Sequence, residues 1–134
     1  DKGEVVFRNQ GACLQCHKVG KDGGVQGPDL SAIAKRLPRE KILESVAIPG
    51  AEIAEGYGMT TVMLKSGDAG LDSKPVEISR SDIGSIAPPV SAMPPMAAAL
   101  PPKDFRDLIA FLASRDGSKN GDDASHGEDE EIAK

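Results

Sequence analysis

Apolar residues recur at the spacing of an amphipathic helix most clearly in the last third of the chain. Within residues 103–114 they occupy positions i, i+3, i+4 and i+7, which are Phe105, Leu108, Ile109 and Leu112. This spacing places the four side chains on one face of a helix. We therefore predict a helix over 103–114 that buries this face, with Gly117 as its C-terminal stop.

Three shorter helical segments are predicted before it. Residues 3–10 form an amphipathic segment, and residues 31–37 have room for one or two helical turns. Residues 39–47 follow Pro38, which suits the first turn of a helix, and Pro49-Gly50 ends the segment. The apolar positions of this third segment are Ile42, Leu43 and Val46. With four helical segments, the chain is expected to have a mostly α fold.

The period of the pattern changes in the middle of the chain. Residues 60–64 are β-branched and apolar, residues 65–68 are a turn signal, and residues 76–78 alternate again. We interpret these segments as a small two-stranded antiparallel β-hairpin. Residues 87–102 then carry six prolines, which favour extended and irregular chain.

Charge is distributed unevenly along the chain. The formal net charge is −5, and residues 117–134 contribute −4 of it, with six acidic and two basic residues. Residues 18–41 carry a net charge of +3, which is too small to indicate nucleic acid, and no aromatic residues are interleaved there. Because the end of the chain has almost no apolar content, we predict a folded domain over 1–116 and a flexible acidic tail over 117–134. A weak calcium site or a partner-docking arm is the alternative role for this tail.

The supply of large apolar side chains is small for a chain of 134 residues. There are three Phe, one Tyr and no Trp, whereas there are 15 Gly and 10 Pro. A bulky apolar cofactor at the centre would supply the burial that these side chains cannot. This composition permits such a cofactor without requiring one.

The segment with the most reactive and metal-binding side chains is Cys13-Leu14-Gln15-Cys16-His17. Two thiols at this spacing can add across the two vinyl groups of a haem, and the adjacent imidazole is then delivered to the iron. A zinc half-site would need further ligands, and only His126 and acidic tail residues remain. A redox dithiol would need a βαβ context, which the helix and glycine-rich loop around Cys13 do not offer. The motif therefore predicts one covalently bound haem c, with its iron, attached to Cys13 and Cys16 and ligated by His17.

The sixth position of that iron needs a second ligand from elsewhere in the chain. Met59 and Met63 lie in or beside the predicted hairpin, where a packing role is the simpler explanation. Met93 and Met96 lie in the proline-rich stretch, which loses little entropy when it is fixed beside a cofactor. Spacing alone does not choose between Met93 and Met96. For His126, the simplest interpretation is a solvated side chain of the tail.

Several separate motifs together resemble the class I c-type cytochromes. They are Gly3-x-x-x-Phe7, Cys13-x-x-Cys16-His17, Gly27-Pro28-Asp29-Leu30, Ser91-Ala92-Met93-Pro94 and Asp107-Leu108-Ile109-Ala110-Phe111-Leu112. More narrowly, the chain is similar to the haem-binding domains that end large dehydrogenase-like proteins of planctomycete and verrucomicrobial bacteria. The resemblance covers roughly residues 3–114, although the strand-rich insertion of that family is abridged here at residues 68–74.

The resemblance implies a fold and a set of site residues. The fold would be that of class I cytochrome c, with a small antiparallel hairpin inserted before the distal methionine loop. The N- and C-terminal helices would cross at Gly3 and Phe7, with Leu108 and either Phe111 or Leu112 opposite. The resemblance assigns the thioether bonds to Cys13 and Cys16 and the proximal position to His17. It further implies that the carbonyl of Pro28 accepts a hydrogen bond from His17, and that Met93 is the distal ligand.

One-electron transfer is the function that this ligand set favours. With His17 and Met93 both bound, the iron would have no open position for a substrate, so we expect an electron carrier rather than an enzyme. The expected partner is a redox protein, a dehydrogenase or an oxidase, and the basic residues that could steer an acidic one are Lys18, Lys21, Lys35, Arg36 and Arg39. The alternative is a peroxidase-like haem enzyme or a ligand sensor with an open or labile distal site.

The expected location is the periplasm, or otherwise outside the cytoplasm, because bacteria attach haem c there. No apolar run approaches the roughly 20 residues of a membrane span. No signal peptide precedes Asp1, so we expect a mature protein or an excised domain without a membrane span.

Overall fold

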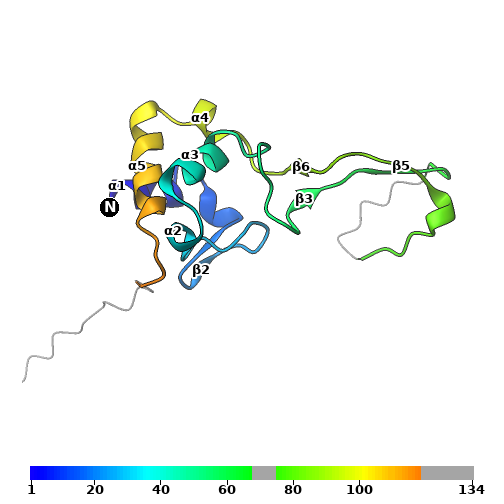
Figure 1. The fold of residues 1–134 in the computed structure, drawn as a ribbon, viewed down its shortest axis with the longest axis horizontal. Coiled ribbons are helices and arrows are strands. Elements are labelled where there is room, and N and C mark those ends of the chain that lie inside the picture. The colour runs from blue at the N-terminus through cyan, green and yellow to red at the C-terminus, as the bar shows by residue number, and fades with distance from the viewer. Residues whose placement is uncertain (68–74, 119–134) are drawn as a thin grey trace, which may run out of the picture.

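The computed structural model describes residues 1–67 and 75–118, which form a helical body and a thin arm that projects from it (Figure 1). The helices of the body are α1 (Lys2–Arg8), α2 (Ile33–Arg36), α3 (Arg39–Ala47), α4 (Met96–Ala99) and α5 (Pro102–Ala113). Two 3-10 turns, η1 (Cys13–Gln15) and η2 (Arg80–Asp82), lie in the connections. Each of the four predicted helical segments overlaps one of these helices, so the expectation of a mostly helical protein is confirmed.

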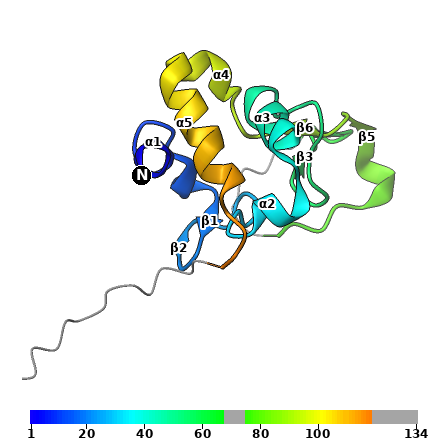
Figure 2. The same cartoon turned by 60° about the vertical axis from the view of Figure 1, so that its left-hand side comes forward.

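The first and last of these helices, α1 and α5, cross at close range (Figure 2). A Cβ added to Gly3 would overlap the carbonyl oxygen of Asp107 and lie 2.6 Å from Cβ of Phe111. The rings of Phe7 and Phe111 pack against each other with their centroids 5.5 Å apart. The missing side chain at position 3 therefore lets the two helix backbones meet, and the predicted crossing is confirmed with Phe111 opposite Phe7.

The hydrophobic core is built around α5, whose Leu108 is fully buried. Helix α3 packs against it through Ile42 and Val46, whereas Leu43 of the same helix is 45% exposed. Burial of apolar side chains on this scale is the main stabilising term of the body. The buried apolar residues are Val6, Phe7, Ile33, Ile42, Val46, Met96, Leu100, Leu108, Ile109, Phe111 and Leu112.

The strands form three separate antiparallel pairs. In the body, β1 (Lys18–Val19) pairs with β2 (Asp22–Gly23), and this small hairpin in the glycine-rich loop is a feature that the sequence pattern did not predict. In the arm, β3 (Gly58–Met59) pairs with β6 (Val90–Ser91). Further out, β4 (Val62–Leu64) pairs with β5 (Ile83–Ile86), with a register shift between Met63 and Leu64.

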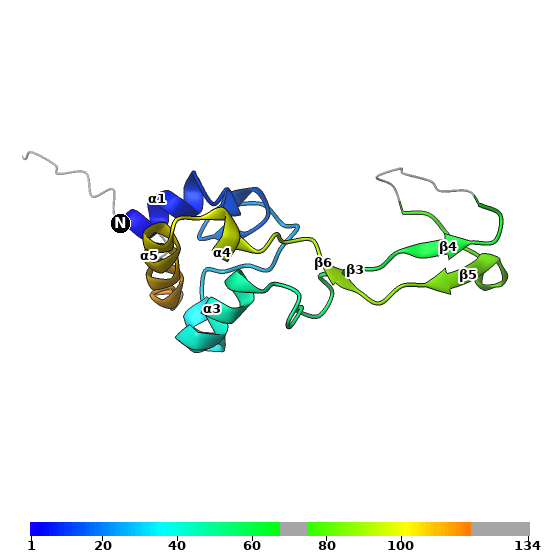
Figure 3. The same ribbon diagram turned by 90° about the horizontal axis from the view of Figure 1, so that it is seen from above.

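The arm, residues 58–91, has its inner pair β3–β6 beside the helices and its outer pair β4–β5 away from them (Figure 3). Six of its large apolar side chains are exposed, because a two-stranded ribbon has no opposing layer to bury them, whereas Val62, Leu64 and Ile83 are half-buried. These exposed side chains are Met59, Met63, Val76, Ile78, Ile86 and Val90.

The predicted hairpin has the right first strand and the wrong second strand. Residues 76–78 are not part of a strand, and Ile83–Ile86 takes their place beside β4. The reason is the turn at Lys65, whose backbone N–H donates to the carbonyl of Asp82 at 2.7 Å. The carboxylate of Asp82 also accepts from the backbone N–H of Ser66 at 3.0 Å. These bonds bring Ile83 opposite Leu64, and β-branched residues occur in both candidate segments, so propensity alone could not choose.

Two further predictions need correction. Residues 87–102 are not extended throughout, because Met96–Ala99 forms the single turn α4, where three consecutive alanines favour a helix. Helix α5 ends at Ala113, one residue before the predicted end, and its C-cap is Ser114 and not Gly117. The hydroxyl of Ser114 donates to the carbonyl of Phe111 at 2.7 Å. Gly117 does have a positive φ of 76°. The predicted tail lies, from residue 119 onward, outside the described residues.

Candidate functional site

The Cys-x-x-Cys-His segment follows directly on the end of α1. Ala12 has a left-handed backbone, with φ of 49°, and the chain then enters the 3-10 turn η1. The backbone N–H groups of Cys16 and His17 both donate to the carbonyl of Cys13, at 3.2 and 2.8 Å. The loop thus brings both thiols and the imidazole onto one tight turn at the edge of the core.

The two thiols have different surroundings. Cys13 is half-buried and packs against the hydrophobic core, whereas Cys16 is exposed. Burial raises the pKa of the Cys13 thiol to about 11, because a thiolate is poorly solvated there. Cys13 therefore lies between the core and the surface, and an apolar group attached to its sulfur would continue the core outward.

The imidazole of His17 is held by the carbonyl of Pro28. Nδ1 of His17 lies 2.8 Å from that carbonyl oxygen, which can only accept a hydrogen bond. Nδ1 therefore carries the proton, and the lone pair of Nε2 is free to bind a metal. This is the pairing of His17 with Pro28 that the resemblance implies.

Gly27 makes this contact possible. A Cβ at position 27 would lie 2.6 Å from Cε1 and 2.8 Å from Nδ1 of His17, closer than side-chain atoms pack. The backbone N–H of Gly27 also donates to the carbonyl of Cys16 at 2.8 Å, which ties the two loops together. The ring of His17 therefore packs directly against the backbone of Gly27, where no side chain intervenes.

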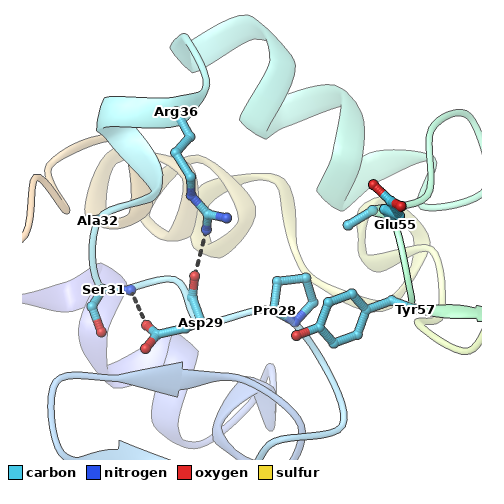
Figure 4. Close-up of a pocket in the computed structure, with 8 residues that line it drawn as sticks. Pro28, Asp29, Ser31, Ala32, Arg36, Glu55 and Tyr57 are labelled. Atoms are coloured by element: carbon cyan, nitrogen blue, oxygen red, sulfur yellow. Dashed lines mark hydrogen bonds between the residues drawn. The ribbon is translucent and has the colours of Figure 1, made fainter.

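The segment after Pro28 is fixed by its own polar contacts, which Figure 4 shows. The carboxylate of Asp29 accepts from the backbone N–H of Ser31 at 2.8 Å, and the guanidinium of Arg36 donates to the carbonyl of Asp29 at 2.6 Å. Hydrogen bonds from the hydroxyl and the backbone N–H of Ser31 lower the pKa of Asp29 below its ordinary value. The backbone that presents the Pro28 carbonyl is therefore held on its C-terminal side.

A hollow of about 540 Å³ opens beside Pro28. In Figure 4 the ring of Tyr57 lies next to Pro28, Glu55 precedes it along the chain, and Arg36 reaches in from α2. Sequence reasoning missed Tyr57 and Glu55, and it considered Arg36 only as a surface charge. The one available signal was that Tyr57 is the only tyrosine of the chain. The full lining of the hollow is Pro28, Asp29, Ser31, Ala32, Arg36, Ala54, Glu55 and Tyr57.

The methionines fall into three environments. Met96 is 6% exposed and belongs to the core, whereas Met59 and Met63 are 57% and 61% exposed on the arm. Met93 is half-buried and packs against the same core cluster as Cys13. Within the described residues, Met93 is therefore the methionine that lies at the edge of the core, and His126 lies outside them.

These donors fit a covalently bound haem. The chain offers two thiols on one turn, an imidazole with a free Nε2 seated on Gly27, and a half-buried thioether at Met93. Across residues 1–67 and 75–118, no group of three or more His, Cys, Asp or Glu side chains could hold a metal ion by itself. In the same ranges, no helix has the length and apolar character required to cross a membrane.

Comparison with known families supports this picture. The family model described as Cytochrome c matches residues 1–116, and a comparison with curated proteins found no significant match. The matched family implies covalently bound haem c with iron, and its Cys-x-x-Cys-His motif is formed here by Cys13, Cys16 and His17. Because the match spans most of the chain, this protein belongs to the cytochrome c family, with haem-based electron transfer as its general role.

Proposed function

We propose that this protein is a one-electron carrier in which His17 and Met93 are the axial ligands of a single haem iron. Cys13 and Cys16 would form the thioether bonds that hold the group. The observation that carries the proposal is the 2.8 Å contact between Nδ1 of His17 and the carbonyl of Pro28. This contact orients the ring, leaves Nε2 free, and increases its basicity as a ligand.

When bound, haem c supplies a one-electron couple, and a thioether ligand raises its reduction potential. The chain's own contribution is to fix the ligands so that they change little between the two charge states. His17 is fixed by Pro28 and Gly27, and Met93 packs against the core.

The surroundings of the site support a redox protein as the partner. We propose that residues 1–116 form the electron-transfer domain, and that a dehydrogenase or an oxidase exchanges electrons with it. Arg36 and Arg39 are exposed on α2 and α3, so they suit a partner with an acidic rim. Export to the periplasm or cell surface belongs to the same proposal, because bacterial haem c is attached outside the cytoplasm.

The decisive experiment is absorption spectroscopy of the oxidised protein. The protein is produced with working cytochrome c maturation, and its mass under denaturing conditions should show one attached haem. The wild type should show the weak red band of a methionine–ferric bond. Met93→Ala should lose the band, have a lower potential, and bind carbon monoxide when reduced. Met96→Leu is the matched control, since it conserves volume in the core and should keep the band.

Two results would contradict the proposal. If Met96→Leu loses the band and Met93→Ala keeps it, the distal ligand is Met96. If the wild type has no band and binds carbon monoxide readily, the distal site is open and a haem enzyme or sensor is the better description.

A further inference from the structure

Met93 is preceded by a local turn that involves a side chain. The backbone N–H of Met93 donates to the hydroxyl oxygen of Ser91 at 3.2 Å. Ser91 is half-buried and is the last residue of β6, so this bond forms where the arm returns to the helical body. The hydroxyl thus satisfies the N–H of Met93 and fixes the direction in which the chain leaves the strand.

Ser91 is itself held by the inner strand pair of the arm. It lies opposite Gly58 in the β3–β6 ladder, and Val90 lies opposite Met59. A Cβ on Gly58 would come within 2.7 Å of Cβ of Pro89, so the two strands approach closely only because position 58 has no side chain. Tyr57, directly before β3, lines the hollow beside Pro28. The ladder therefore connects the Met93 loop to Tyr57 and so to the hollow beside Pro28, the residue whose carbonyl accepts from His17.

The chain is fixed on the other side of Met93 as well. Pro94 and Pro95 restrict the backbone, and Met96 is anchored in the core at the start of α4. Between Ser91 and Met96, the backbone of Met93 has little freedom left. A side chain presented from such a backbone loses less conformational entropy when it binds a ligand than one on a free loop.

We propose that Ser91 is a positioning residue for Met93, and that its hydroxyl determines how firmly the thioether is held at the iron. This inference rests on the proposed axial role of Met93. Without the hydroxyl, the N–H of Met93 loses its partner and the residue can rotate away from the site. The thioether of Met93 would then be held less firmly at the iron, although Met93 itself is unchanged.

The test compares Ser91→Ala, Ser91→Thr and the control Ser85→Ala in holoprotein. Ser85 is an exposed serine of β5 in the outer part of the arm. The measurements are the rate of cyanide binding to the oxidised protein, the red band, the potential and the unfolding midpoint. Ser91→Ala should bind cyanide about 3-fold to 10-fold faster, the factor expected for one lost hydrogen bond, with a weaker band and a lower potential. Ser91→Thr retains a hydroxyl and should restore wild-type values, and Ser85→Ala should match the wild type.

The inference is overturned if Ser91→Ala matches Ser85→Ala in cyanide rate, band and potential. It is equally overturned if Ser91→Ala lowers only the unfolding midpoint, since that result shows a purely structural serine. Met93→Ala separates this failure from that of the proposed function. If Met93→Ala loses the band while Ser91→Ala behaves as wild type, only the positioning role is wrong. If Met93→Ala keeps the band, the axial assignment is wrong and the positioning role is overturned with it.

Discussion

Gly27 lies so close to His17 that any side chain at position 27 would occupy the space of the imidazole ring. The nearest ring atom, Cε1, is 2.6 Å from the position that a Cβ would take. The same loop supplies the carbonyl of Pro28 that holds Nδ1 of this ring. One short segment therefore both orients the imidazole and leaves space for it, and this pairing is directly testable.

Gly27→Ala should displace the His17 ring and weaken its contact with Pro28. We expect a free energy of unfolding lower by about 1–3 kcal/mol, the usual cost of overpacking, together with an altered ferric spectrum. The measurements are denaturant unfolding and absorption of the oxidised holoprotein. Gly50→Ala is the matched control, because a Cβ there would meet nothing within 4 Å. Equal stability and equal spectra for the two variants would show that the ring tolerates the added methyl group.

Gly3→Ala should loosen the crossing of α1 and α5. The added methyl group would overlap the carbonyl of Asp107 and press on Phe111, so the helices would have to separate. We expect about 1–3 kcal/mol lower stability by chemical denaturation, even though alanine favours a helix more than glycine does. Val5→Ala on α1 serves as the control, because Val5 is 51% exposed and its loss should change stability by no more than about 0.5 kcal/mol. A stabilised Gly3→Ala protein would mean that the helices do not meet at this residue.

Asp29 should make part of the stability dependent on acid pH. Its pKa is lowered by the hydrogen bonds from Ser31, so the carboxylate stabilises the folded state fully above the ordinary aspartate pKa of about 3.9. That contribution is lost as the pH falls through the lowered pKa of the folded state. Asp29→Asn cannot titrate, so its unfolding midpoint should fall less steeply than that of the wild type as the pH decreases below about 4. Parallel midpoint curves for the two proteins would show that Asp29 contributes nothing to the acid transition.

Much of the helical body was predictable, because the signals are local. Four apolar positions at helical spacing identified α5 within one residue at each end, and Pro38 and Ala47 bound α3 as the pattern indicated. The Cys13–His17 motif likewise identifies its chemistry within five residues. In these cases the residues that decide the outcome are neighbours along the chain, so backbone geometry translates their spacing directly into structure.

Other features depended on residues that are distant in the sequence. Ile83–Ile86, and not residues 76–78, pairs with β4 because of the bonds between the turn at Lys65 and Asp82. Met93 and Met96 have the same local composition around them, and only packing shows that Met96 is part of the core while Met93 lies at its edge. Tyr57 lies beside Pro28 only because of the way the chain between them folds. The sequence by itself determined the helices and the attachment chemistry, since both follow from short-range spacing. The strand partners, the burial of each methionine and the walls of the hollow were decided only by the tertiary structure, because they depend on which distant segments meet.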